Sequence, residues 1–163
     1  MSIETNIYIG VYIKVPNATI EFDKTLYFDP ATNNPRSSKY NPETGEPNLE
    51  KLVKKTEKIH PWPDIEELLA DGEEFSGDTD EFWCPQYGPW GDNFSLFMLN
   101  STKSKYRIRH ANDNEDCTDL LDRDTDYKKL IEEFKVEYKP WLDIYEREYG
   151  EIYVGYGVIT YSN

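Results

Sequence analysis

The sequence predicts an α+β fold, in which a single domain forms a mixed or antiparallel sheet packed on one side by a long, Pro-kinked C-terminal helix. Two observations support this fold class: strand patterns stand near both ends of the chain, and a helical stripe precedes the last strand. Aromatic residues, 15% of the composition, are expected to supply much of the core. A chain of 163 residues can bury roughly two thirds of its unfolded surface. We therefore expect one hydrophobic core over residues 1–163.

The first strand is predicted over residues 7–15. Its odd positions are β-branched residues from Ile7 to Val15, while Tyr8 and Tyr12 stand among its even positions, and this period of two is typical of a strand. Four further strands are predicted, at residues 20–28, 94–99, 106–110 and 151–161. The last of them, at residues 151–161, is apolar on both faces, so we expect it to lie in the middle of the sheet.

The strongest helical pattern covers residues 127–149, where apolar residues recur at steps of three and four. Pro140 lies inside this stripe and removes a backbone donor, which predicts a kink or a break into two helices. Asp124 or Thr125 is expected to cap the start of the helix, and Gly150 its end. Two shorter helices are predicted, at residues 47–58 and 64–70.

Two segments carry the charge imbalance of the chain, whose formal net charge is −14. Residues 59–102 contain ten carboxylates and no Lys or Arg, and residues 111–126 contain seven carboxylates and one Arg. The rest of the chain is therefore slightly positive, since −14 minus −16 leaves +2. Such a field opposes direct binding to nucleic acid or anionic membranes and favours a basic partner.

The first acidic segment is also rich in aromatic residues, and residues 71–93 are expected to form a long loop with its own aromatic anchors. Rings within a field of carboxylates suit a protein interface, because the rings provide desolvated contacts while the charge steers a basic partner. The simpler interpretation is a solvated surface, and the second segment is adequately explained as the approach to a helix N-terminus. The predicted contact residues are Asp71, Glu73, Glu74, Asp78, Asp80, Glu81, Phe82, Trp83, Asp113, Glu115, Asp116 and Asp119.

The residue types of a zinc site are present in His60, Cys84, His110 and Cys117. Structural zinc normally takes ligands in close pairs two to four residues apart, and this spacing is absent here. We expect two reduced cysteines, because the chain has no secretory signal and no apolar stretch near the roughly 20 residues that span a bilayer. The expected location is therefore cytoplasmic.

Metal and enzyme motifs are otherwise missing from the sequence. Residues 113–116 and 122–126 cluster oxygen ligands, yet neither has the Gly and Glu positions of a calcium loop. There is no nucleophile elbow, Gly-rich phosphate loop or His-Glu-x-x-His helix. We expect no cofactor, no metal and no catalytic residue, and keep as the alternative a small hydrolase or metal-dependent enzyme whose acids converge in the fold.

One basic pattern opposes the acidic trend. Lys103, Lys105, Arg107 and Arg109 alternate along a predicted strand and would share one face. Such a row could contact phosphate. At this net charge we favour a solvated face that neutralises the neighbouring acids.

Two similar turns stand in the N-terminal third, at residues 29–32 and 41–45. With the Tyr-rich strand before them, they resemble small uncharacterised proteins of tailed bacteriophages, in which the turns read Cys-Pro-x-x and Cys-Pro-x-Cys-Gly and hold zinc. The resemblance covers about 50 residues, and Asp29, Asn41 and Thr44 stand where ligands would be, so no zinc is implied. It implies an early phage protein that binds and inhibits a host factor.

The resulting hypothesis is an acidic, non-enzymatic protein that binds a basic host protein in the host cytoplasm. The partner could itself bind nucleic acid, in which case the carboxylates would stand in for phosphates. A structural or assembly component is the remaining alternative, with the oligomeric state left open.

Overall fold

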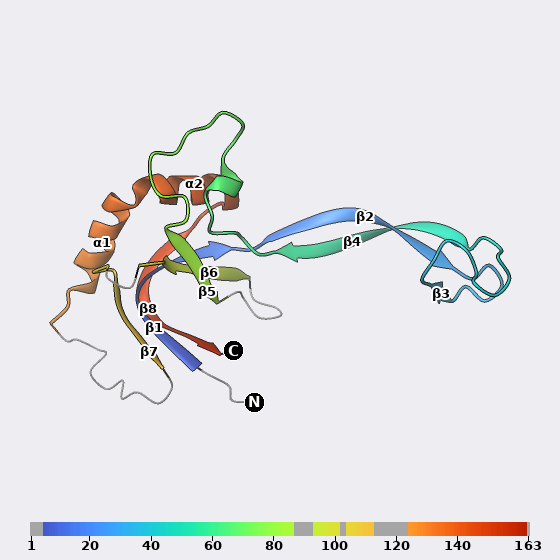
Figure 1. Ribbon diagram of the computed structural model, residues 1–163, viewed down its shortest axis with the longest axis horizontal. Helices are drawn as coiled ribbons and strands as arrows, with labels where there is room; N and C mark the ends of the chain where they lie inside the picture. The colour runs from blue at the N-terminus through green and yellow to red at the C-terminus, as the bar shows by residue number, and fades with distance from the viewer. Residues whose placement is uncertain (1–4, 87–92, 102–103, 113–123, 163) are drawn as a thin grey trace. The chain divides into compact units, whose positions relative to one another are not determined.

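The computed structural model describes residues 5–86, 93–101, 104–112 and 124–162 (Figure 1). By its internal contacts the chain divides into two compact units, one of Met1–Ala18 with His60–Asn163 and one of Thr19–Ile59. We call the first the body and the second the ribbon. Strands and helices are both well represented, which confirms the α+β class, while the expectation of one domain stays a prediction.

The body contains a five-stranded antiparallel sheet with β1 (Thr5–Pro16) in the middle (Figure 1). Strand β8 (Tyr153–Ser162) pairs with one edge of β1 over Thr5 to Lys14. The other edge of β1 is shared, with β7 (Arg107–Asn112) paired near its start and β6 (Phe94–Leu99) near its end. Strand β5 (Phe82–Gln86) completes the sheet beside β6.

Strand β8 does not lie in the middle of the sheet as expected, because β1 is its one sheet neighbour among the described strands. Its two apolar faces have another cause. Tyr156 stacks on Tyr127 at the start of the helical layer, with ring centroids 4.2 Å apart, while Ile159 is buried in a small cluster on the other face.

Glycine is required where β1 passes from β7 to β6. The pairing register shifts between Ile9 and Gly10, and the Val11 amide donates to the Tyr106 carbonyl at 2.7 Å. A Cβ on Gly10 would lie 2.2 Å from that carbonyl oxygen. Only a residue without a side chain lets the two backbones approach this closely.

Two helices cover one face of the sheet, α1 (Tyr127–Glu137) and α2 (Lys139–Tyr149) (Figure 1). Each has 11 residues, so the single long kinked helix of the prediction is wrong and the break into two helices is observed. The helix ends at Tyr138, with φ −102° and ψ 16°. Pro140 then falls in the first turn of α2, where its missing N–H would have no intrahelical partner.

The body core lies between these helices and the sheet, and it is unusually aromatic. Phe82, Phe97, Phe134 and Tyr145 are each at most 1% exposed and meet mainly edge to face. The N-terminus of α1 is capped by Asp126, one or two residues later than expected, whose Oδ1 accepts from the Lys129 amide at 3.1 Å. The aromatic content of the sequence is thus largely used inside the body.

The ribbon consists of two long antiparallel strands, β2 (Ala18–Phe28) and β4 (Leu49–Ile59), with the short β3 (Pro35–Arg36) beside β2 (Figure 1). The helix expected at residues 47–58 is therefore wrong, and this segment is strand β4. Its apolar spacing suits a helix, but hydrogen bonding to β2 decides the conformation.

The second short helix is also largely wrong, since it is reduced to a 3-10 turn, η1 (Glu66–Leu68). Two local features limit it. The Asp64 Oδ1 accepts from the Glu66 amide at 2.9 Å, and Leu69 returns to an extended backbone with φ −73° and ψ 139°. The segment therefore crosses the helical layer as a loop with one tight turn.

The two similar sequence turns are also similar in structure. The Asn33 amide donates to the Asp29 carbonyl and the Gly45 amide to the Asn41 carbonyl, both at 2.8 Å, and Asn33 and Gly45 both have positive φ, at 59° and 73°. The Asp29 side chain accepts from Ala31 N at 2.8 Å, as Asn41 does from Glu43 N at 2.9 Å. These side chains stabilise their own turns.

Candidate functional site

The acidic loop, residues 64–81, lies beside α2 in the body (Figure 1). Helix α2 holds the loop and its approach at three places. The Tyr145 hydroxyl donates to the Pro63 carbonyl at 2.6 Å, the Trp141 Nε1 to the Asp78 carbonyl at 2.8 Å, and Arg147 makes two hydrogen bonds to the Glu73 carboxylate. The Arg147 contact lowers the pKa of Glu73. The loop is therefore ordered by the protein's own side chains.

Close packing reinforces this attachment. The Phe75 ring meets the Trp141 indole edge to face at 5.1 Å, and a Cβ on Gly77 would lie 2.4 Å from the same indole. Phe82 is 1% exposed and contacts the rings of both helices, so it is a core residue and cannot act as a partner anchor. The assignment of Phe82 to the binding surface is corrected accordingly.

Four of the predicted contact residues remain exposed on the loop, and they are Asp71, Glu74, Asp78 and Asp80. Within the part of the chain that the structure describes, none of the four forms an ion pair. The Asp78 Oδ1 accepts from the Asp80 amide at 3.0 Å, which fixes the direction of that carboxylate. The exposed charge is thus presented by a fixed backbone.

Glu81 lies at the end of the loop and is partly buried. Its Oε1 accepts from the Tyr138 hydroxyl at 3.4 Å. Burial raises the pKa of Glu81, and the negative charges of Asp78 and Glu137 raise it further, although the Tyr138 contact opposes them. The direction of this shift reflects first the partial burial of the Glu81 carboxylate and second the neighbouring negative charges.

A hollow of about 240 Å³ opens between the acidic loop and β5. Its lining includes Trp62, Asp64 and Asp80, and also Trp83 of β5, whose ring packs against Tyr8 and Arg107 in the small cluster on the other face of the sheet. Trp62 is 52% exposed, while its backbone N–H and C=O are both hydrogen-bonded to the Tyr149 hydroxyl. Trp83 is fixed by donation from its Nε1 to the Leu99 carbonyl at 3.2 Å.

The sequence predicts Trp83 and Asp80 as contact residues, but it does not predict that Trp62 and Asp64 line the same hollow. Trp62 stands between two prolines, Pro61 and Pro63, which are both buried. That arrangement, a large ring between two buried prolines, is the one signal that could have indicated an exposed ring on a rigid backbone.

The second predicted patch, Asp113, Glu115, Asp116 and Asp119, lies outside the described residues and stays a prediction. Cys117 of the hypothetical zinc set lies there too.

The other members of that set are not gathered in one place. Cys84 is buried in the core on the helix side of the sheet, whereas His110 stacks on Tyr8 with ring centroids 4.7 Å apart. Tyr8 belongs to the cluster on the opposite face. Among the described residues, no three His, Cys, Asp or Glu side chains are close enough to hold a metal ion.

The basic row expected at residues 103–109 is not formed by its described members. Lys105 lies in a turn before β7 and pairs at 3.2 Å with Glu133 of α1, which lies outside both acidic segments. Arg107 is 7% exposed, and its guanidinium lies 5.1 Å and 5.2 Å from the ring centroids of Tyr8 and Trp83. A buried, stacked arginine supports the sheet and is not available to phosphate.

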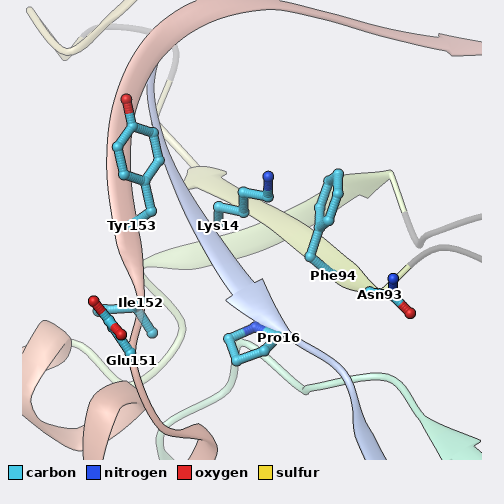
Figure 2. Close-up of a pocket in the computed structure, with 7 residues that line it drawn as sticks. All are labelled: Lys14, Pro16, Asn93, Phe94, Glu151, Ile152 and Tyr153. Carbon is cyan, nitrogen blue, oxygen red and sulfur yellow. The ribbon is translucent and has the colours of Figure 1, made fainter.

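A second hollow, of about 390 Å³, lies where β1, β6 and the start of β8 meet (Figure 2). Figure 2 shows the Lys14 side chain between the rings of Tyr153 and Phe94. The Lys14 ammonium is 3.9 Å from the Phe94 centroid, so its charge is already directed to a protein ring. This hollow could accommodate a small apolar group. Glu151, the one carboxylate in its described lining, belongs to neither acidic segment.

Comparison with known proteins adds no relative: the chain matches no family model, no curated protein and no solved structure. Of the two described helices, neither is long and apolar enough to cross a membrane.

Proposed function

We propose that this chain is a non-enzymatic binding protein that holds a basic protein on the acidic loop. The hollow between Trp62 and Trp83 carries this proposal. A Lys or Arg side chain of the partner would lay its apolar part against the exposed Trp62 indole and place its charge near Asp64 and Asp80. An exposed ring beside two carboxylates suits a long basic side chain better than most others.

The other exposed carboxylates of the acidic loop would extend the binding surface. Asp71, Glu74 and Asp78 would steer the partner electrostatically and meet further basic side chains. Because α2 already fixes the loop, binding would not require the loop to become ordered, and little conformational entropy would be lost.

We further propose that binding inhibits the partner by covering its basic site. If that site recognises nucleic acid, the carboxylates of the loop take the places of phosphates. The resemblance of the N-terminal residues to bacteriophage proteins supports a host protein as the partner, and the host cytoplasm as the location.

One observation favours acid–base chemistry as a second candidate. Glu81 contacts the Tyr138 hydroxyl and Glu137 accepts from the Tyr106 hydroxyl, so two carboxylate–tyrosine pairs lie near one another, and the pKa of Glu81 is raised. However, neither hollow described above is lined by Glu81 or Glu137. These two hollows of the described residues would therefore not bring a substrate to either pair, and we favour binding.

The test is a comparison of three baits in host lysate, read by mass spectrometry. The first is the natural chain and the second carries Trp62→Ala, Asp64→Asn and Asp80→Asn. The third is a matched control in the ribbon, with Tyr40→Ala, Glu43→Gln and Glu46→Gln; Tyr40 is 55% exposed, much as Trp62 is. We expect a basic protein on the first and third baits that is lost from the second. Equal capture by all three would contradict the proposal.

A further inference from the structure

Strand β4 presents a long free edge. It has 11 residues, and within the described residues β2 is its one sheet neighbour. All of its side chains are exposed except that of Val53, which is half-buried, and Leu52 is 70% exposed. A two-stranded ribbon is only marginally stable in water, and the unpaired N–H and C=O groups of an edge can accept another strand.

The charges of β4 have a specific order. Lysines on an edge strand often serve only to discourage pairing. Here, however, the charges of β4 are complementary to those of the same strand running in the opposite direction, when Lys54 is taken as the common centre. Glu50 then corresponds to Lys58, and Lys51 to Glu57.

We propose that β4 pairs antiparallel with β4 of a second copy of this chain, about a two-fold axis at Lys54. In this register Glu50 lies opposite the second copy's Lys58, and Lys51 opposite the second copy's Glu57, and symmetry repeats both pairs. The ends also match, because Leu49 lies opposite Ile59. Lys54 alone meets its own copy, at the axis.

Neighbouring registers are unfavourable. A shift by one residue places Glu50 opposite Glu57 in one direction, and Lys51 opposite Lys58 in the other. A shift by two residues places Lys51 opposite Lys55, or Lys55 opposite itself. None of these four registers forms an opposite-charge pair, so the sequence favours the proposed alignment over its nearest neighbours.

Pairing would also cover part of the exposed surface of β4. The two copies would form a sheet with four long strands, β2 and β4 from each, and Leu52 would gain the second copy's Thr56 as a cross-strand neighbour. The pairing does not involve the acidic loop, so it is independent of the proposed function.

Sedimentation equilibrium of the full-length chain tests the register. The natural chain is expected to dimerise. Glu57→Lys places Lys opposite Lys51 in both halves of the interface, and Lys51→Glu places Glu opposite Glu57. Each single variant should raise the dimer dissociation constant at least about tenfold, since two attractive pairs become repulsive. Glu43→Lys, in the exposed tip, makes the same charge change away from β4 and should leave the dimer intact.

Mixing the two single variants in equal amounts provides the decisive arm. Each Lys of Glu57→Lys then meets a Glu of Lys51→Glu, so a heterodimer of near-natural affinity is expected. This result also shows that both variants are folded. A natural chain that stays monomeric, a Glu43→Lys variant that weakens the dimer as Glu57→Lys does, or a mixture without heterodimer would overturn the proposal.

Discussion

At the residue scale, Phe82 and Trp62 show how two rings of one acidic segment take opposite roles. Phe82 is 1% exposed within the aromatic core, whereas Trp62 is 52% exposed beside the hollow. Sequence reasoning selected Phe82 and omitted Trp62, because composition shows that rings and acids are mixed but does not show which rings face inward. The number of rings predicts an aromatic core, but it does not predict which rings face that core.

Substitution of these rings should separate stability from binding. Phe82→Ala is expected to lower the free energy of unfolding by about 3–5 kcal/mol, as for other large buried aromatics. Trp62→Ala should change it by less than about 1 kcal/mol, because Trp62 is 52% exposed. Denaturant unfolding monitored by circular dichroism measures both. A mild Phe82→Ala variant would show that this ring is not part of the core.

Glu81 provides a test of how burial and neighbouring charge act on a carboxylate of the acidic loop. Because its pKa is raised in the folded state, the folded chain binds more protons near that pKa than the unfolded chain does, and stability falls as the pH rises through it. Glu81→Gln removes this effect. The variant should therefore gain stability over the natural chain at pH 7, and the gain should shrink as the pH falls toward the ordinary pKa of a glutamate.

Urea unfolding of both chains, at pH 7 and at the lowest pH at which both remain folded, gives the comparison. A Glu81→Gln variant that is less stable than the natural chain at pH 7 would mean that the Tyr138 hydrogen bond outweighs the burial and charge effects.

At the element scale, Pro140 distinguishes one kinked helix from two separate ones. In the interior of a helix, Pro140→Ala would restore a hydrogen bond and stabilise the chain by up to about 3 kcal/mol. In the first turn of α2 the missing N–H has no such partner. We expect Pro140→Ala to change the free energy of unfolding by less than about 1 kcal/mol, and a large stabilisation in thermal or denaturant unfolding would contradict the two-helix description.

The elements that sequence reasoning found are those whose patterns are long and regular. The alternation of β1 and the three-and-four spacing of α1 and α2 both reflect regularly spaced buried residues, and each pattern predicts the type of element that is observed, although the helical one is divided in two. The sequence of β4 predicts a helix because neither face of the strand is buried, so the spacing of its apolar residues does not follow a core-facing side. Its neighbour β2, more than 20 residues away in the chain, decides its conformation, and such long-range pairing is not visible in a local pattern.

At the scale of the whole molecule, the division into two units sharpens the meaning of the charge. The ribbon, Thr19–Ile59, has seven basic and seven acidic residues and is neutral. The body therefore has 18 − 7 = 11 basic and 32 − 7 = 25 acidic residues, which is the full net charge of −14. Electrostatic steering of a basic partner would thus come from the body alone. The neutral ribbon, in contrast, suits the proposed pairing with the ribbon of a second copy.

The proposed function requires that a basic partner bind the acidic loop and the hollow lined by Trp62 and Trp83. The most direct test is the dissociation constant for the partner captured by the baits, measured by calorimetry over a range of salt concentration. For the natural chain we expect the constant to rise at least about tenfold between roughly 50 and 300 mM salt, since screening weakens exposed charge contacts. Asp64→Asn with Asp80→Asn should weaken binding and flatten this dependence. An affinity that is unchanged by salt, or by the two substitutions, would contradict the account.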